Sequence, residues 1–232
     1  MTRSAIIALF LIFLCPFTSL FAQDKTLEQV LESKIFLEEG QNAIAVHGIE
    51  LYSQGELPRF YSNRDFEPAW NNSKNKKDLI ESLESSYDEG LSPNDYHLEM
   101  IKSLSAKSKN DTLNLEDKAD FDLLMTDALI LYVSHLLEGK LEQSDLRKTW
   151  DVERNEGPSN PDSLLTATLH NKRIKVVLEE FKPTHYMYKL MKLHLKRLRT
   201  EASEGGWPLE SDRRTLKPGD SSARVVEVRK YL

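Results

Sequence analysis

The chain has 232 residues, of which 40% are hydrophobic and 29% are charged, and 31 lysines and arginines against 37 aspartates and glutamates give a net charge of -6. This composition is typical of a globular protein of one or two domains and excludes collagen-like, low-complexity and wholly disordered chains. A single cysteine excludes a disulfide framework and a cysteine-based zinc site. The acidic balance argues against nucleic acid as a partner, because phosphate binding needs clustered positive charge.

Residues 1–22 have the pattern of an export signal peptide. Arg3 precedes an unbroken apolar run over residues 5–14, and small and apolar residues lead to Ala22. The run is shorter than the roughly 20 residues that a membrane-spanning helix needs, so cleavage after Ala22 is favoured over a retained anchor. We therefore expect an exported protein of the periplasm or cell envelope, with no transmembrane segment after cleavage.

The single cysteine, Cys15, lies inside this segment. A lipoprotein would use it as the lipidated residue, but Leu14 is larger than the small residue that usually precedes such a cysteine. Cleavage after Ala22 would therefore leave the mature chain without any thiol.

Apolar residues recur at helical spacing along almost the whole mature chain, while strand-like alternation is hard to find, so we predict a mainly α fold. The first expected helix runs from Thr26 to Glu38, with Gly40 as its stop. Residues 51–70 contain a dense group of aromatic side chains interrupted by two prolines. Aromatic residues at this density are typical of a core anchor, and we assign them to packing.

Two helices are expected next. The first starts at Lys77 and ends at Gly90, whose lack of a side chain suits a helix C-terminus. The second begins with Ser92 as its N-cap and Pro93 at its first position. The polar residues 105–114 are then expected to form a surface loop.

The strongest helical pattern runs from about Asp117 to Glu138, with Gly139 as its stop, and we expect it to be the central helix. Asp127 and His135 lie on or beside its apolar face, where an acid–base pair could be suspected. They are separated by about 12 Å along a helix axis, which is too far for a hydrogen bond. We therefore interpret both as satisfied polar groups of the core.

The last third of the mature chain is also predicted to be helical. A loop over residues 155–161 ends where Asn160 and Pro161 restart a helix, and Pro183 breaks the chain again. An amphipathic stripe then follows at Tyr188, Met191, Leu195, Leu198 and Ala202. The opposite face is basic, with Lys189, Lys192, Lys196, Arg197 and Arg199. We interpret this face as solvated or envelope-facing rather than as a nucleic-acid patch.

The sequence carries no complete catalytic pattern. No HExxH, GxSxG or P-loop spacing occurs, and the six histidines lack metal-ligand spacing. Adjacent acidic residues such as Glu179 and Glu180 point to different faces of a helix and do not form a carboxylate pair. We therefore predict no catalytic residue, no metal site and no cofactor in this chain.

Four segments, in this order, resemble the helical scaffold domain of the large, YcbB-like L,D-transpeptidases, which cross-link the stem peptides of bacterial peptidoglycan. They are FYSNRDFEPAW at 60–70, SYDEGLSPNDYHL at 86–98, DLLMTDALILYVSHLLEGKL at 122–141 and PTHYMYKLMKLHLKRLRTEASEGGWPL at 183–209. The resemblance implies a scaffold-like helical domain over residues 23–210. We assign its tryptophans, Trp70, Trp150 and Trp207, to packing.

A fifth segment, over 214–232, resembles the opening of a peptidoglycan-binding-like domain, a small helical module. The organisation implied is a signal peptide at 1–22, the scaffold-like domain at 23–210 and the incomplete start of this module at 211–232. Pro218 and Gly219 would make a turn, after which Asp220 or Ser221 would cap a helix. Its apolar face would be Val225, Val228 and Leu232, which need partners that this chain does not obviously supply. The alternative is a single terminal helix.

If this segment meets peptidoglycan, the candidate contacts are Asp220, Ser221 and Arg224. Exposed backbone amides and a guanidinium group there could bind the carboxylates of stem peptides.

The resemblance also implies a β-rich, YkuD-type catalytic domain with a nucleophilic cysteine in an SHGCxR-like motif beside a histidine. This sequence has neither, and Cys15 lies in the export signal, so no catalytic residue can be carried over. We interpret the chain as the non-catalytic N-terminal region of an L,D-transpeptidase-like cell-wall protein, with the catalytic domain missing from this chain. Its expected partners are peptidoglycan stem peptides and cell-wall synthesis proteins.

Two other interpretations stay open. The chain could be a stand-alone exported module that binds peptidoglycan or serves as an adaptor. It could also be an unrelated exported helical enzyme, such as a carboxylate-based wall hydrolase.

Overall fold

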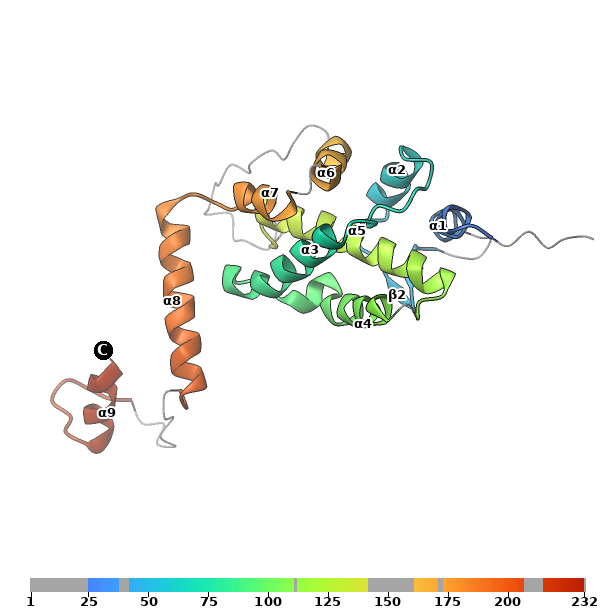
Figure 1. The fold of residues 1–232 in the computed structure, drawn as a ribbon. Coiled ribbons are helices and arrows are strands. Elements are labelled where there is room, and N and C mark those ends of the chain that lie inside the picture. Colours follow the sequence, from blue (N-terminus) through green and yellow to red (C-terminus); the bar gives the residue numbers. More distant parts are fainter. Residues whose placement is uncertain are drawn as a thin grey trace, which may run out of the picture.

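The computed structural model describes residues 25–37, 42–110, 112–141, 161–170, 173–206 and 215–231. Over these residues the fold is mainly α, as predicted, and most of the shorter helices lie around one long helix (Figure 1). The predicted signal peptide at 1–22, Gly40, the loop before Pro161, Trp150 and Trp207 lie outside the described residues.

The α-helices, in chain order, are α1 (Leu27–Ile35), α2 (Glu56–Ser62), α3 (Ser73–Ser85), α4 (Leu98–Lys109), α5 (Leu115–Glu138), α6 (Pro161–His170), α7 (Ile174–Phe181), α8 (Tyr186–Ser203) and α9 (Ala223–Tyr231). Two short 3-10 helices, η1 (Ser86–Glu89) and η2 (Pro93–Tyr96), connect α3 to α4. The strands β1 (Ala45–Val46) and β2 (Ile49–Glu50) form an antiparallel hairpin between α1 and α2.

Helix α5 is the centre of the fold, as its sequence pattern predicted. It has 24 residues, and every residue from Ala119 to Leu129 is buried, so this part of the helix is covered on all sides. Asn114 caps its start by accepting a hydrogen bond from the backbone N–H of Asp117 at 2.7 Å. Gly139 ends it with a φ of 82°, a conformation that favours glycine.

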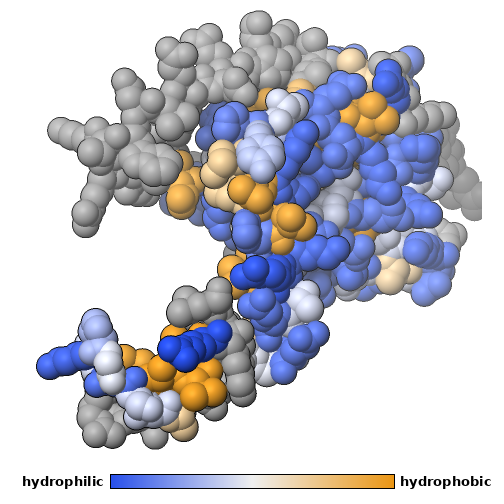
Figure 2. Space-filling view, turned by 90° about the vertical axis from the view of Figure 1, so that its left-hand side faces the viewer, coloured by the Kyte–Doolittle hydropathy of each residue, from blue (hydrophilic) through white to orange (hydrophobic). Residues whose placement is uncertain are grey.

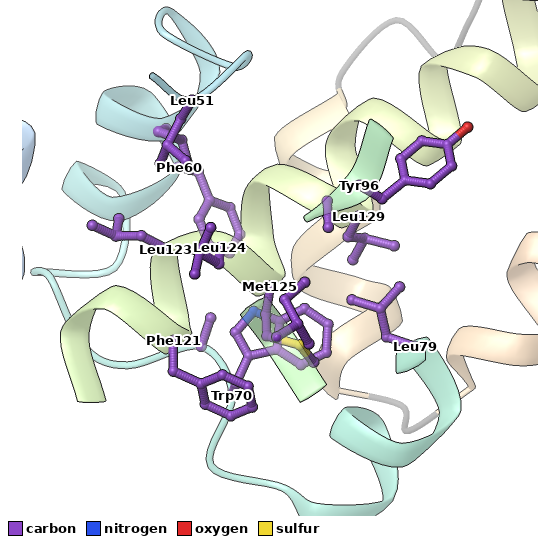
Figure 3. Close-up of a cluster of buried hydrophobic side chains, with 14 of the residues drawn as sticks. Leu51, Phe60, Trp70, Leu79, Tyr96, Phe121, Leu123, Leu124, Met125 and Leu129 are labelled. Carbon is purple, nitrogen blue, oxygen red and sulfur yellow. The ribbon is translucent and has the colours of Figure 1, made fainter. Parts of the chain in front are cut away.

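The aromatic segment of residues 51–70 packs against α5, which confirms its assignment to the core. Phe60, Tyr61 and Trp70 are buried. Figure 3 shows the side chain of Phe60 beside those of Leu123 and Leu124 of α5, and that of Trp70 beside those of Phe121 and Met125. The segment contributes α2 and the loop after it, so this part of the core joins residues that are distant in sequence.

Helix α1 also packs against α5. Its capping box joins Thr26 and Gln29 reciprocally, and Val30, Leu31 and Ile35 are buried. The helix ends at Ile35, three residues before the predicted end at Glu38. The backbone of Phe36, which follows, is already extended.

The hairpin was not predicted. Each strand has only two residues, too few to give a visible alternation of apolar and polar residues. His47 and Gly48 connect the strands and both have positive φ angles, 49° and 77°, which is the backbone of the two-residue turns that suit the twist of a hairpin.

The connection between α3 and α5 differs from the prediction in two respects. Ser92 makes no side-chain cap, and His97, at a φ of 54°, separates the 3-10 helix η2 from α4. Helix α4 then continues to Lys109, so the prediction of a loop over all of residues 105–114 is wrong. The polar residues of its last turns lie on the exposed side of an amphipathic helix whose other side buries Ile101 and Leu104.

Helix α3 begins earlier than predicted. It starts at Ser73, because the side chain of Asn72 accepts hydrogen bonds from the backbone N–H groups of Lys74 and Asn75. Gly90 ends the helical stretch with a φ of 81°, as its position after Tyr87 suggested, but the last turn is the 3-10 helix η1.

Helix α8 extends away from the other helices, and α9 lies beyond its far end (Figure 1). The predicted amphipathic stripe is present, but none of the 18 residues of α8 is buried. Met191 and Leu198 are 60% and 50% exposed, while Tyr188 and Leu195 are half-buried. In the described part of the chain, no helix is long and apolar enough to cross a membrane.

We expect Leu31→Ala to lower the free energy of unfolding by about 2–5 kcal/mol, because it leaves a cavity between α1 and α5. Urea denaturation followed by far-UV circular dichroism measures this loss. The matched control is Leu37→Ala, at an exposed leucine just after α1, which should change the value by no more than about 0.5 kcal/mol. Equal small effects of the two substitutions would mean that α1 is not part of the folded core.

Candidate functional site

The predicted peptidoglycan contact lies in the turn before α9. The backbone N–H of Asp220 donates to the carbonyl of Lys217 at 3.0 Å, and the Asp220 carboxylate accepts from the backbone N–H of Lys217 at 2.8 Å. Gly219 occupies the turn with a φ of 96°. The turn that was predicted at Pro218 and Gly219 is therefore present, and the Asp220 side chain closes it.

The helix cap is Ser222, not Asp220 or Ser221. The backbone N–H of Val225 lies 3.4 Å from the hydroxyl oxygen of Ser222 and donates to it, as an N-cap requires. Sequence spacing alone could not choose among these three polar neighbours, because each is one of the residue types that cap helices. Asp220 and Ser221 are left exposed at the helix start, and Arg224 is half-buried.

The apolar side chains around α9 are mostly exposed. Val226 and Val228 are 58% and 41% exposed, Leu216 is 37% exposed and Val225 is half-buried. Figure 2 shows hydrophobic side chains gathered at this lower end of the molecule. A nine-residue helix with such exposure does not bury its own apolar side, in line with the expectation that it needs a partner surface.

A second group of residues with ionisable or hydroxyl side chains lies in the core, around Asp122. The Asp122 carboxylate accepts hydrogen bonds from the hydroxyl of Tyr61 at 2.6 Å and from the backbone N–H groups of Ala69 and Trp70 at 2.8 and 3.0 Å. The Thr126 hydroxyl lies 2.8 Å from the Tyr61 oxygen and accepts from the indole N–H of Trp70 at 3.0 Å. Burial raises the pKa of the Asp122 carboxyl, and this effect outweighs the three hydrogen-bond donors, which lower it. Burial also raises the pKa of the Tyr61 hydroxyl well above its usual range. These groups hold α2 and the Trp70 loop on α5 and are closed to a substrate.

Asp127 and His135 have separate partners, which confirms that they do not form a pair. Asp127, fully buried, accepts from the backbone N–H of Ser53 at 2.7 Å and contacts Nε2 of His97 at 2.9 Å. Nδ1 of His135 is 2.9 Å from the hydroxyl of Tyr96. Both residues have polar partners, as interpreted from their spacing, but only Asp127 lies in the core, since His135 is half-buried.

One cluster with metal-binding residue types was not predicted. His47, Asp117 and Asp120 each present a ligand atom within 4.8 Å of the others. Their separation in sequence hides this proximity, which arises because the hairpin turn lies beside the first turns of α5. The ammonium of Lys34 is 2.9 Å from Asp120 and 2.9 Å from Glu116.

Lys34 already supplies the positive charge of this cluster. Burial lowers the pKa of Lys34, but its hydrogen bonds with Asp120 and Glu116 outweigh that effect and raise it. The lysine therefore stays charged, and we interpret the cluster as an ion-pair network that attaches α1 to α5.

Ser73 and Lys76 have the SxxK spacing of some serine acyltransferases. They lie in the first turn of α3, where Ser73 is exposed and the ammonium of Lys76 is 5.5 Å from the ring centroid of Phe121. This cation–π contact gives the lysine a structural role.

The architecture is that of a helical scaffold whose buried polar groups serve packing. A family model described as "Scaffold domain" matches residues 55–195, more than half of the chain, and the chain belongs to this family. The matched range runs from the start of α2 into α8, and α1, the hairpin and α9 lie outside it. Comparisons with curated proteins and with solved structures gave no match.

We expect Asp122→Ala to lower the free energy of unfolding by about 2–6 kcal/mol, because two buried backbone N–H groups lose their acceptor and each such loss costs about 1–3 kcal/mol. Asp122→Asn keeps one acceptor oxygen and should lose less. Urea titration monitored by tryptophan fluorescence measures both.

The control for this prediction is Asp88→Ala, which removes an exposed aspartate outside the core and should leave stability within about 0.5 kcal/mol of the parent. A loss for Asp122→Ala no larger than that of the control would contradict the assigned role.

Proposed function

We propose that this chain is the non-catalytic scaffold region of an L,D-transpeptidase-like cell-wall protein of the YcbB-like class, acting in peptidoglycan cross-linking. The observation that carries the proposal is the membership of residues 55–195 in the Scaffold domain family. The order of the four sequence segments that resemble these enzymes supports the finer assignment.

The hydrogen bonds of the buried carboxylates support a structural role for them rather than a catalytic one. The most deeply buried carboxylates, those of Asp122 and Asp127, have their oxygens turned to backbone amides and to the side chains of Tyr61 and His97. A general base needs an accessible lone pair within reach of a substrate proton. These carboxylates instead fix the loops that surround α5.

The position of α9 supports a role for the C-terminal end in contact with another surface. Helix α9, which carries the exposed Val226 and Val228, lies beyond α8 and away from the main helical body (Figure 1). We propose that residues 211–232 are the start of a peptidoglycan-binding-like module. The signal peptide pattern of residues 1–22 supports export to the periplasm or cell envelope.

A stand-alone peptidoglycan-binding or adaptor module is the second candidate. The exposed turn at Asp220 and Ser221, followed by Arg224 in the first turn of α9, favours it, because a guanidinium and helix-start amides suit a carboxylate ligand. The two candidates differ in whether a catalytic domain belongs to the same protein. Reading the codons that follow Leu232 in the genome distinguishes them, since the first candidate requires a cysteine and histidine motif there.

We expect the purified chain to form no new stem-peptide cross-links when incubated with sacculi, because the proposed reaction needs a cysteine thiolate and the chain contains no thiol after residue 15. Muramidase digestion followed by mass spectrometry measures cross-linked fragments directly. Cross-link formation by the chain alone, absent from a heat-denatured sample, would contradict the non-catalytic assignment.

If the turn before α9 contacts stem peptides, Arg224→Ala should weaken sacculus binding by about 10- to 100-fold, the loss of a charge-assisted hydrogen bond of about 1.5–3 kcal/mol. Cosedimentation with purified sacculi at several protein concentrations measures this. Arg229→Ala is the matched control, because Arg229 is an exposed arginine on the same helix. Equal binding by the two variants would remove the turn from the proposed contact.

A further inference from the structure

Helix α8 is held to the body of the protein by polar side chains. None of its residues is buried. The contacts that do reach the body centre on η1, the 3-10 turn that follows α3. The chain enters α8 through Pro183, directly after α7 and its cap residue Lys182. The direction of α8 therefore depends on a short connection and on what binds it at η1.

The side chain of Glu89 in η1 is the centre of this attachment and is only 4% exposed. One of its oxygens accepts from the ammonium of Lys192 at 2.6 Å and from that of Lys182 at 2.9 Å. Its other oxygen accepts from the hydroxyl of Tyr188. A single carboxylate thus binds the residue before the Pro183 break and two residues of α8 after it.

Two further contacts lie along the same side of α8. The guanidinium group of Arg199 lies 3.3 Å from the ring centroid of Tyr87 and donates to the backbone carbonyl of that residue. Leu195 lies over Gly90, where an added Cβ would meet its side chain at 3.6 Å. Lys192 and Arg199 therefore contact the body, so the expectation that the whole basic face of α8 is solvated is wrong for these two residues.

The charges of these groups suit a permanent contact near neutral pH. Burial raises the pKa of Glu89, but the donors Lys192, Tyr188 and Lys182 outweigh it and the pKa is lowered, so the carboxylate is ionised. Burial raises the pKa of Tyr188, which keeps its hydroxyl protonated as a donor. Glu179 of α7 pairs with Lys182 on the same side.

We infer that Glu89 is a latch that sets the direction of α8 relative to α7 and the central helix. Because α8 has no buried apolar side, the loss of this carboxylate leaves only the Arg199 contact with Tyr87 and Leu195 over Gly90, and these do not fix the helix against swinging about the Pro183 connection. The scaffold body remains folded, since its core around α5 does not include α8. The contacts of Glu89 therefore determine where the segment that follows α8 lies relative to the body.

The test measures the distance between α5 and the far end of α8. Spin labels at Lys118→Cys and Ser203→Cys, in a Cys15→Ser background, report this distance by double electron–electron resonance. We expect one narrow distance in the parent chain and a broad distribution, with the parent distance largely lost, in Glu89→Gln. The thermal midpoint should not change.

The control is Glu84→Gln, which removes the same charge from an exposed ion pair with Lys102 between α3 and α4 and should keep the parent distance. If Glu89→Gln lowers the thermal midpoint, the double variant Tyr188→Phe and Lys192→Met removes both α8 donors and leaves the body unchanged. If Glu89→Gln, or that double variant, keeps the parent distance distribution, Glu89 does not set the direction of α8 and the proposal is wrong.

Discussion

The carboxylate of Asp122 is the interaction on which the rest of this fold depends. It lies on the most buried part of α5 and accepts the Tyr61 hydroxyl and the backbone N–H groups of Ala69 and Trp70. An irregular loop that enters a core brings amide groups whose desolvation is costly unless an acceptor is provided. Asp122 provides it, and Trp70 can then pack against the central helix. The aromatic segment and α5 become one unit through this acid.

The same use of acids recurs through the molecule. Asp127 holds the backbone before α2, and Asp120 pairs with Lys34 of α1. Glu89 holds α8 in the same way. Each acid adds a polar contact that helps to fix the position of an element against its neighbour. The oxygens of these acids are engaged by groups on other elements, so these buried acids serve the relative placement of helices.

Much of this arrangement follows from local sequence. The central helix, its glycine stop and the core role of residues 51–70 were predictable because a buried helix and dense aromatic residues leave strong local patterns. The separate roles of Asp127 and His135 followed from helix geometry alone. Such features can be predicted from the sequence because they depend on residues within a few helical turns of each other.

The remaining features depend on contacts between distant residues. The two-residue strands of the hairpin carry no periodic pattern, and His47 meets Asp117 only after the hairpin turn reaches α5. The choice of Ser222 over Asp220 as a cap rests on a turn that occupies the Asp220 carboxylate. The engagement of Lys192 by Glu89 could not be predicted either, because a lysine on the polar face of a helix has the same pattern whether water or a buried acid binds it.

Asp122 joins the Trp70 loop and α5 into one rigid unit. Native-state hydrogen exchange of the Ala69 and Trp70 amides tests it most directly, because both groups donate to that carboxylate. We expect these amides to exchange only through global unfolding, with the same free energy and denaturant dependence as the amides of α5. Exchange through a local opening that leaves α5 protected would contradict it.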